Sequence, residues 1–527
     1  MLKDMLLSVY ALVACVIVLF WLYSRSTFDY WRKRNVFFFK PLPYIGNFAP
    51  ILLVRLSMHE FFDKMYRQLD NLPYGGFFEM RTPVLLVKDP ELITHILTTD
   101  FKHFTDRGFD FLYPNRKLNP INVNIFNAAG QRWKMLRQKM TPIFTTGKLK
   151  TMQEQLICCT SMLFDHLEAT GEDVNLKDAF DRFAIDVIGM CAFGLECNST
   201  KSNDQFRDMG YELFKPSFRK SLPWLCRTIS TKLLEWFNLP DFPNYVTNFY
   251  SNLLLDTVLY RRQNNVVRND FLQLLMDLQN DAVDPKYAPD GNKSNLTSDS
   301  FDEIDIVANA FLIFAGGFES TAITLSFCVY ELAVNKNIQE KLRDEVLQVR
   351  AKYDDKKSYE CYQGMTYMEQ VILETTRKYP PFPVLYRKCE DDYIMPKTGL
   401  KLQRGDKINI PAWSVHHDWK YYPNPELFDP DRFTPEKKES RPAGTFLSFG
   451  EGPRFCMGKR FVIFEIKIVL SELLLKYDFV PSCKTEMPVV MMKAPFSTVA
   501  EDGPWIKLIN RSNLIYEESY QDNVQSK

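Results

Sequence analysis

The chain has 527 residues, a length that suits one large domain or two to three smaller ones. Its 65 basic and 65 acidic residues balance, whereas a nucleic-acid-binding protein normally carries a strong basic excess, so we expect no nucleic-acid partner. The 11 cysteines are an odd number in a long chain, which predicts free thiols in a reducing compartment rather than a disulfide framework. The sequence contains no CxxC pair and no HExxH motif, so a zinc site is not expected.

The first element is an apolar run from Met5 to Tyr23, about 19 residues long, which is close to the length of a membrane-spanning helix. A cleaved signal peptide is the alternative, but it needs a small-residue cleavage site, and this run ends in aromatic residues that suit a membrane interface. Basic residues follow at Arg25 and Arg32–Arg34, and the positive-inside rule places this side in the cytosol. We therefore expect a transmembrane signal anchor at residues 1–24, spanning once, with the bulk of the chain in the cytosol.

Beyond the anchor we expect a basic, proline-containing linker at residues 25–50, a large folded domain at 51–513 and a polar tail at 514–527. Periodicity predicts a helix near Met58–Leu69 and strands at Phe77–Arg81 and Val84–Lys88, after which helical periodicity dominates. The polar stretch Asp277–Ser300 contains two prolines and a glycine, which predicts a surface loop. The expected fold is mostly α with a smaller β region.

The densest signal is the segment Phe449–Gly458, in which three glycines, a proline and an arginine surround Cys456. A lone cysteine is usually a small buried apolar residue, but that interpretation leaves the glycines and Arg454 at their fixed spacing unexplained. A glycine-rich loop brings backbone N–H groups close to the sulfur, and the N-terminus of the helix predicted at Lys459–Lys476 favours a thiolate. Hydrogen bonds of this kind tune a metal-bound sulfur.

This segment matches the FxxGxRxCxG haem-binding signature at every fixed position and thereby resembles the cytochrome P450 superfamily. The resemblance extends over the whole chain, anchor included, and is greatest to the microsomal enzymes of insects that metabolise foreign compounds. This finer placement also uses residues 103–108. The resemblance implies the cytochrome P450 fold, with residues 51–513 as a haem-thiolate catalytic domain, haem b (iron protoporphyrin IX) as cofactor and Cys456 as axial ligand of its iron.

The same loop contains a Gly-x-Gly pair, which is not a dinucleotide-binding fingerprint because the third glycine position holds Phe455. The chain is therefore expected not to bind NADPH itself. The resemblance implies that electrons come from an NADPH-dependent cytochrome reductase on the same membrane. Cytochrome b5 is a second expected partner, although the sequence leaves its need open. Arg132, Lys134 and Lys139 are candidate docking residues, but solvated helix charges are the favoured explanation for each of them.

Trp133 and Arg137 lie at positions i and i+4, on one face of a predicted helix, which by itself is typical of an amphipathic helix. The resemblance implies instead that both donate to a haem propionate, as do Arg454 and Arg387. Together with Cys456, these four are the cofactor-binding residues that the resemblance implies.

Glu374 and Arg377 lie one turn apart on a predicted helix, a spacing that alone is typical of a surface ion pair worth little. The resemblance implies that they form a buried network with Arg432 behind the cysteine loop. A satisfied charge network fixes one geometry, so its expected role is to hold the haem pocket and not to do chemistry.

The helical pattern Ile306–Leu332 is interrupted at Ala315–Thr321, where two glycines each cost about 1 kcal/mol relative to alanine. We expect the helix to bulge there to admit O2, with Glu319 and a neighbouring hydroxyl relaying protons. The family position after the acid is usually threonine and is Ser320 here, with Thr321 next. More leakage to peroxide is expected, because serine is less rigid than threonine. Whether Ser320 or Thr321 serves stays open.

The resemblance implies a monooxygenase of the endoplasmic reticulum membrane that inserts one oxygen atom of O2 into lipophilic small molecules, such as plant toxins or insecticides. Substrate contacts are expected from five apolar and aromatic stretches, at residues 104–126, 206–218, 311–318, 380–385 and 496–499. A haem-thiolate isomerase or dehydratase, which needs no reductase, and a non-catalytic binder of lipophiles are the alternatives. The acid–hydroxyl pair disfavours the first, and the glycine gap beside the acid disfavours the second.

Overall fold

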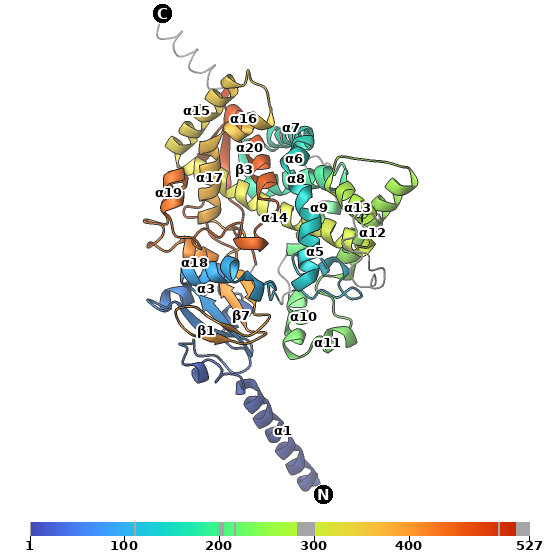
Figure 1. The fold of residues 1–527 in the computed structure, drawn as a ribbon, viewed down its shortest axis with the longest axis vertical. Coiled ribbons are helices and arrows are strands. Elements are labelled where there is room, and N and C mark those ends of the chain that lie inside the picture. The colour runs from blue at the N-terminus through green and yellow to red at the C-terminus, as the bar shows by residue number, and fades with distance from the viewer. Residues whose placement is uncertain are drawn as a thin grey trace, which may run out of the picture.

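The computed structural model describes residues 2–109, 112–197, 199, 205–214, 218–281, 301–493 and 496–512. Helices make up most of this part of the chain and its strands form small sheets, so the predicted mostly α fold with a smaller β region is confirmed (Figure 1). The predicted polar tail and most of the loop predicted at 277–300 lie outside the described residues. Residues 277–281 are helical, so the predicted start of that loop is wrong.

The described elements follow one another along the chain as helices with interspersed short strands. The helices are α1 Leu2–Arg25, α2 Ala49–Leu52, α3 Met58–Gln68, α4 Pro90–Thr94, α5 Gly130–Met140, α6 Thr146–Thr151, α7 Gln153–Thr170, α8 Leu176–Ile188, α9 Gln205–Phe214, α10 Phe218–Ile229, α11 Thr231–Trp236, α12 Asn244–Gln263, α13 Phe271–Asp281, α14 Glu303–Val334, α15 Lys336–Lys352, α16 Tyr359–Gly364, α17 Thr366–Lys378, α18 Ala412–His416, α19 Pro435–Ser440 and α20 Lys459–Lys476. The strands are β1 Tyr74–Glu79, β2 Thr82–Val87, β3 Asp173–Asn175, β4 Leu385–Lys388, β5 Tyr393–Ile394, β6 Lys401–Leu402, β7 Lys407–Ile410, β8 Tyr477–Pro481 and β9 Trp505–Asn510.

The sheet with the strand order β1-β2-β7-β4 places one of the residues expected to bind the cofactor. β1 and β2 form an antiparallel hairpin, β7 runs parallel to β2, and β4 is antiparallel to β7. Arg387 lies opposite Ile408 of β7 and is the buried residue of β4. The other sheets have the orders β3-β9-β8 and β5-β6.

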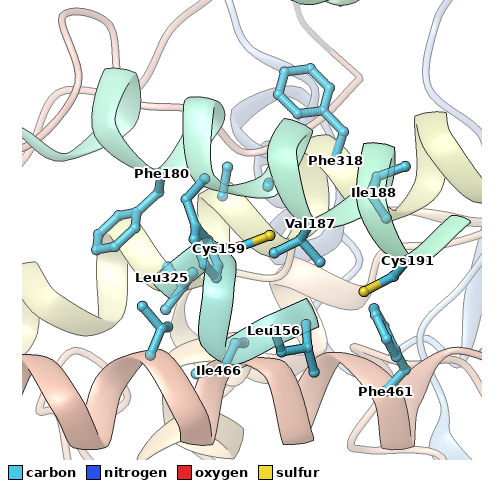
Figure 2. Close-up of a cluster of buried hydrophobic side chains, with 14 of the residues drawn as sticks. Leu156, Cys159, Phe180, Val187, Ile188, Cys191, Phe318, Leu325, Phe461 and Ile466 are labelled. Atoms are coloured by element: carbon cyan, nitrogen blue, oxygen red, sulfur yellow. The ribbon is translucent and has the colours of Figure 1, made fainter. Parts of the chain in front are cut away.

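The long helix α14 runs through the helical part of the protein and is buried over most of its length (Figure 1). It begins with a capping box, in which the side chains of Asp302 and Asp305 accept each other's backbone N–H groups. α8 packs along it, and α7 and α20 complete the main core. Figure 2 shows side chains from all four helices converging there, among them Leu156, Ile188, Leu325 and Ile466.

The interruption predicted within this helix is wrong, because α14 is continuous from Glu303 to Val334. Its two glycines serve different purposes. A Cβ on Gly317 would lie 2.5 Å from Cδ1 of Ile188, so this glycine allows α8 to pack closely against α14. A Cβ on Gly316 would have no atom within 4 Å, so of the two only Gly316 borders open space.

The N-terminal helix α1 extends away from the rest of the protein (Figure 1). An apolar window within Asp4–Arg25 has a mean hydropathy of 2.7 and is 0% buried. By length and composition α14 could also cross a membrane, but 67% of its apolar window is buried within the protein, as in a core helix. α1 therefore fits a single-pass membrane anchor.

The stretch predicted as a linker contacts the first sheet. Trp31 is fully buried, its indole N–H donates to the carbonyl of Phe77, and Phe38 pairs with Gly76 of β1. A Cβ on Gly76 would meet the Trp31 ring at 2.4 Å, so this contact requires glycine. The boundary at residue 50 between linker and catalytic domain stays a prediction.

Candidate active site

The Cys456 loop is shaped by two glycines. Gly450 and Gly452 have φ angles of 69° and 67°, a conformation that L side chains rarely adopt. A Cβ on Gly452 would lie 1.8 Å from the carbonyl oxygen of Leu97, so the loop can approach that carbonyl only with glycine at this position. The backbone N–H of Cys456 donates to the carbonyl of Phe449 at 2.8 Å, which closes the loop shortly before α20.

The Cys456 thiol faces open space inside the protein. The Cys456 side chain keeps accessible surface. Protein atoms nevertheless surround the thiol, and this burial raises its pKa. The accessible surface therefore opens into space inside the protein. Hydrogen bonds from the backbone N–H groups of Gly458 and Lys459 act to lower the pKa of Cys456, as do the charges of Arg107 and Arg137. These groups favour the thiolate, which is the form of cysteine that binds a metal.

Four guanidinium groups gather beside this thiol. Arg387 and Arg454 are each 3% exposed, and Arg107 and Arg137 are close enough to Cys456 for their charges to act on it. Burial, together with repulsion between guanidinium groups, lowers the pKa of Arg454 to about 8, of Arg387 to about 9 and of Arg107 to about 10. The cluster therefore holds several like charges at an electrostatic cost.

Among the described residues, no carboxylate forms an ion pair with any of these four guanidinium groups. Their hydrogen bonds go to backbone carbonyls instead, as from Arg107 to Phe126 at 3.0 Å. The Arg454 guanidinium also lies 4.7 Å from the centre of the Trp133 ring. Nε of Arg387 and Nε of Arg454 are buried and have no hydrogen-bond partner. Buried charges are normally paired, so this cluster predicts a ligand with more than one negative group.

The sequence motifs do not single out Arg107, because an arginine between Asp106 and Gly108 has the composition of an ordinary turn. In the fold, the Asp106 carboxylate accepts the N–H of Gly108 at 2.8 Å, and Gly108 has a φ of 61°. The N–H of Lys388 donates to the Asp106 carbonyl at 2.9 Å, which ties this turn to β4. The turn thereby places Arg107 next to Arg387.

The structure brings Glu374, Arg377 and Arg432 together, all of them buried. Glu374 accepts two hydrogen bonds from Arg377, at 2.7 and 2.9 Å, and lies 3.4 Å from Arg432. His416, which the sequence motifs do not include, joins this network to the cysteine loop. Its Nε2 accepts the N–H of Leu447 at 2.8 Å, so its Nδ1 carries the proton and donates to the Arg377 carbonyl at 3.1 Å. Burial lowers the pKa of His416 well below its usual range, which keeps the ring neutral.

Glu319 lies in α14 and is buried, and burial raises the pKa of its carboxyl to about 7, while a hydrogen bond with Ser497 acts in the opposite direction. The hydroxyl of Ser320 donates to the Gly316 carbonyl at 2.6 Å and keeps accessible surface. Thr321 is fully buried, and its hydroxyl has no partner within the described residues. Of the two hydroxyls, that of Ser320 borders the open space at Gly316.

Aromatic rings from two of the stretches expected to contact substrate, residues 104–126 and 496–499, meet the ring of Tyr386 beside the arginine cluster. The Phe109 ring lies 5.1 to 5.9 Å from three other rings, those of Phe126, Tyr386 and Phe496. Phe109 and Arg107 also line a cavity of about 550 Å³. This side of the site therefore combines apolar rings with a positive charge.

Some side chains that the sequence suggests for binding are used inside the protein. The Phe rings at 311–318 are at most 3% exposed and pack into the main core, where Figure 2 places Phe318. Arg132 forms an ion pair with the buried Asp305 at 2.5 Å, so it is not an unpaired surface charge. Lys134 remains exposed on α5.

The charges of Asp106 and Glu390 act on Arg454 without forming an ion pair with it, so the guanidinium groups beside the Cys456 thiol fit a metal cofactor that carries negative groups. Haem fits both features, because its iron takes a thiolate ligand and its two propionates match the guanidinium groups. The cytochrome P450 family model matches residues 38–503, and the chain belongs to this family. It is accordingly a monooxygenase, an oxidoreductase that uses haem iron and O2.

The relatives include insect members of the family, as predicted. The chain is 35% identical over 487 residues to cytochrome P450 6k1 of Blattella germanica, covering 91% of this chain and 92% of that protein. It is 32% identical to cytochrome P450 9e2 of the same species, covering 95% of this chain and 97% of that protein. Probable cytochrome P450 6a13 of Drosophila melanogaster is 35% identical, with 95% of this chain and 99% of that protein covered.

Proposed function

We propose that this chain is a membrane-anchored haem-thiolate monooxygenase that oxidises lipophilic foreign compounds with electrons from an NADPH-dependent reductase. The observation that carries the proposal is the cluster of four guanidinium groups, which have no carboxylate partner among the described residues and lie beside a thiol facing internal space. Haem b satisfies both requirements at once. When bound, it supplies the activation of O2, with one oxygen atom going into the substrate and the other into water.

One set of residues would hold this cofactor, and a second set keeps the cysteine loop in place. With haem bound, Cys456 would supply the thiolate ligand of its iron, and Trp133, Arg107, Arg137, Arg387 and Arg454 would hold its propionates. Glu374, Arg377 and Arg432 keep the cysteine loop in place, and the contact from Arg377 to the loop runs through His416 and Leu447. Because each member of this second set is buried and hydrogen-bonded, the set fixes one loop geometry.

Glu319 and Ser320 deliver the protons that the reaction consumes. With a pKa of about 7, the Glu319 carboxyl both accepts and gives up a proton near neutral pH. The Ser320 hydroxyl borders the open space at Gly316, whereas Thr321 is enclosed, so we favour Ser320 as the relaying hydroxyl. Serine is less rigid than threonine, and we expect part of the O2 consumed to end as peroxide.

Three features support the proposed substrate class, membrane topology and cellular compartment. The aromatic rings around Phe109 favour lipophilic substrates. The exposed helix α1 is followed by basic residues, which favours a single span in the endoplasmic reticulum membrane with the catalytic domain in the cytosol. The cysteines form no disulfide among the described residues, which is compatible with a reducing compartment. Lys134 is one candidate contact for the reductase, and cytochrome b5 is a second proposed partner.

The test is the carbon monoxide difference spectrum of the reduced, membrane-expressed protein beside that of Cys456→Ser. The expected result is a Soret band at the red-shifted position of thiolate-ligated haem, absent from the variant. A band at the position of histidine-ligated haem, or no band in well-folded protein, would remove the axial assignment and with it the proposed mechanism. Turnover that proceeds without any reductase would instead favour a haem-thiolate isomerase or dehydratase.

A further inference from the structure

A cluster of three polar side chains, two from α8 and one from α9, lies next to Glu319. None of the three is among the residues proposed to hold the cofactor. Lys177 and Asp181 lie one turn apart in α8, and the Lys177 ammonium donates to both Asp181 oxygens, at 2.5 and 2.6 Å. Tyr211 of α9 hydrogen-bonds to the same carboxylate. The Lys177 ammonium also lies 5.9 Å from the ring centre of Phe318, the residue directly before Glu319. These contacts place the pair beside the turn of α14 that carries Glu319.

Burial increases from Lys177 toward Asp181. The Lys177 side chain is 20% exposed, whereas that of Asp181 is 1% exposed and Glu319 is likewise buried. Burial raises the pKa of Asp181, so this carboxyl takes up a proton more readily than an exposed aspartate does. A group that contacts solvent, a buried carboxyl that can be protonated and Glu319 therefore lie in one neighbourhood.

The charges acting on Glu319 come from this pair. The positive charge of Lys177 acts to lower the pKa of Glu319, and the negative charge of Asp181 acts to raise it. The hydroxyl of Ser497, from the C-terminal loop, is a neutral partner of Glu319. Three further groups lie nearby: Asp178 and Arg182 pair with each other at 2.9 Å on α8, and Arg207 of α9 acts on Tyr211.

We propose that Lys177 and Asp181 form the solvent-side end of the proton route to Glu319. They are positioning residues whose charges control whether the Glu319 carboxyl is protonated or ionised. In the step, a proton from solvent binds the Asp181 carboxylate and passes to the Glu319 carboxylate. Asp181 then returns to its ionised form beside the Lys177 ammonium, and no electrons move. The proposal rests on the role of Glu319 in proton delivery given above.

The first test titrates Glu319 in the full-length haem-loaded protein at rest. Infrared difference spectra follow its carboxyl band, which is assigned by its absence in Glu319→Gln. Lys177→Met removes an attractive charge, so we expect the midpoint to rise by about one pH unit. Asp181→Asn removes a repulsive charge, so the midpoint falls. Lys177→Gln replaces Lys177→Met if the latter does not fold.

Two matched variants sharpen this test. Lys177→Arg keeps the charge and is expected to keep the wild-type midpoint. Arg182→Met breaks the neighbouring pair with Asp178 on the same helix and is expected to leave the midpoint unchanged, because Arg182 is not among the charges acting on Glu319. Midpoints that stay at the wild-type value in both Lys177→Met and Asp181→Asn, or that move in the same direction, would overturn the proposal.

The second test measures turnover. Asp181→Asn is expected to increase the peroxide formed per NADPH and to shift the pH profile of the rate in step with the infrared midpoint. A shifted midpoint with an unchanged peroxide yield and pH profile would overturn the proton route. If Glu319→Gln itself leaves turnover and its pH profile unchanged, the proposed role of Glu319 fails, whatever the infrared titration shows for Lys177 and Asp181.

Discussion

Gly452→Ala tests how firmly the cysteine loop depends on its contact with Leu97. The new Cβ would lie 1.8 Å from the carbonyl oxygen of Leu97 and 2.8 Å from its carbonyl carbon, at a φ of 67°. The left-handed backbone costs an L residue about 1–2 kcal/mol, and overpacking typically adds about 1–3 kcal/mol. Because the obstacle is backbone, the loop has to move by about 1 Å before the contact reaches 3.0 Å. We expect a destabilisation of about 3 kcal/mol and a displaced Cys456.

Gly450→Ala is the matched control for this prediction. Gly450 has a φ of 69°, but the atom nearest to its Cβ would lie 3.7 Å away, so the control carries the backbone cost alone. The measurements are the haem content and the thermal unfolding of both purified variants. We expect Gly452→Ala to lose most of its haem and its thiolate Soret band, and Gly450→Ala to keep both. Equal losses in the two variants would refute the steric part of the reasoning, and wild-type behaviour of Gly452→Ala would refute all of it.

Three further predictions concern α14 and the network behind the loop. Burial raises the pKa of Glu319 from 4.5 to about 7, so the unfolded chain ionises first and the native protein loses up to about 3 kcal/mol as the pH rises from 4.5 to 7. The Glu319→Gln variant should not show this loss of unfolding free energy. Parallel curves of unfolding free energy against pH for the variant and the wild type would contradict the prediction. Gly317→Ala should lower the melting temperature, because its Cβ meets an isoleucine of α8 at 2.5 Å, whereas Gly316→Ala meets no atom and should not; equal melting temperatures would exclude this difference. His416→Ala leaves the buried N–H of Leu447 without an acceptor, at a cost of about 1–3 kcal/mol, and should release haem on gel filtration; full retention would show that the loop does not need His416.

Short-range spacing allowed much of the fold and part of the site to be predicted. α20 begins and ends at the predicted residues, because its periodicity is local. Trp133 and Arg137 share a helix face, and Glu374 and Arg377 form an ion pair, because an α-helix brings residues at these spacings together. In each of these cases secondary structure alone determines the geometry.

Contacts between distant segments were beyond such patterns. The hydrogen bond from Leu447 to His416 spans 31 residues, and that from Arg107 to the Arg454 carbonyl spans 347, so no local pattern predicts either contact. The interruption of α14 was predicted wrongly for a related reason. Helix propensity counts the cost of Gly317, but it does not count the close packing of Ile188 that offsets this cost.

The four guanidinium groups link the fold to the cofactor. An arginine keeps its proton in proteins, so a pKa of about 8 for Arg454 expresses the cost of holding its charge beside other cations and does not make the side chain neutral. Two propionates bound among these groups would add negative charge, and relief of the repulsion would then contribute to the free energy of haem binding. The same side chains donate to the chain around them, Arg107 to the carbonyl of Phe126 and Arg137 to that of Phe455, directly before Cys456. The residues proposed to bind the cofactor thus also position the segment that would supply its ligand, so we expect haem binding and the ordering of this loop to be coupled.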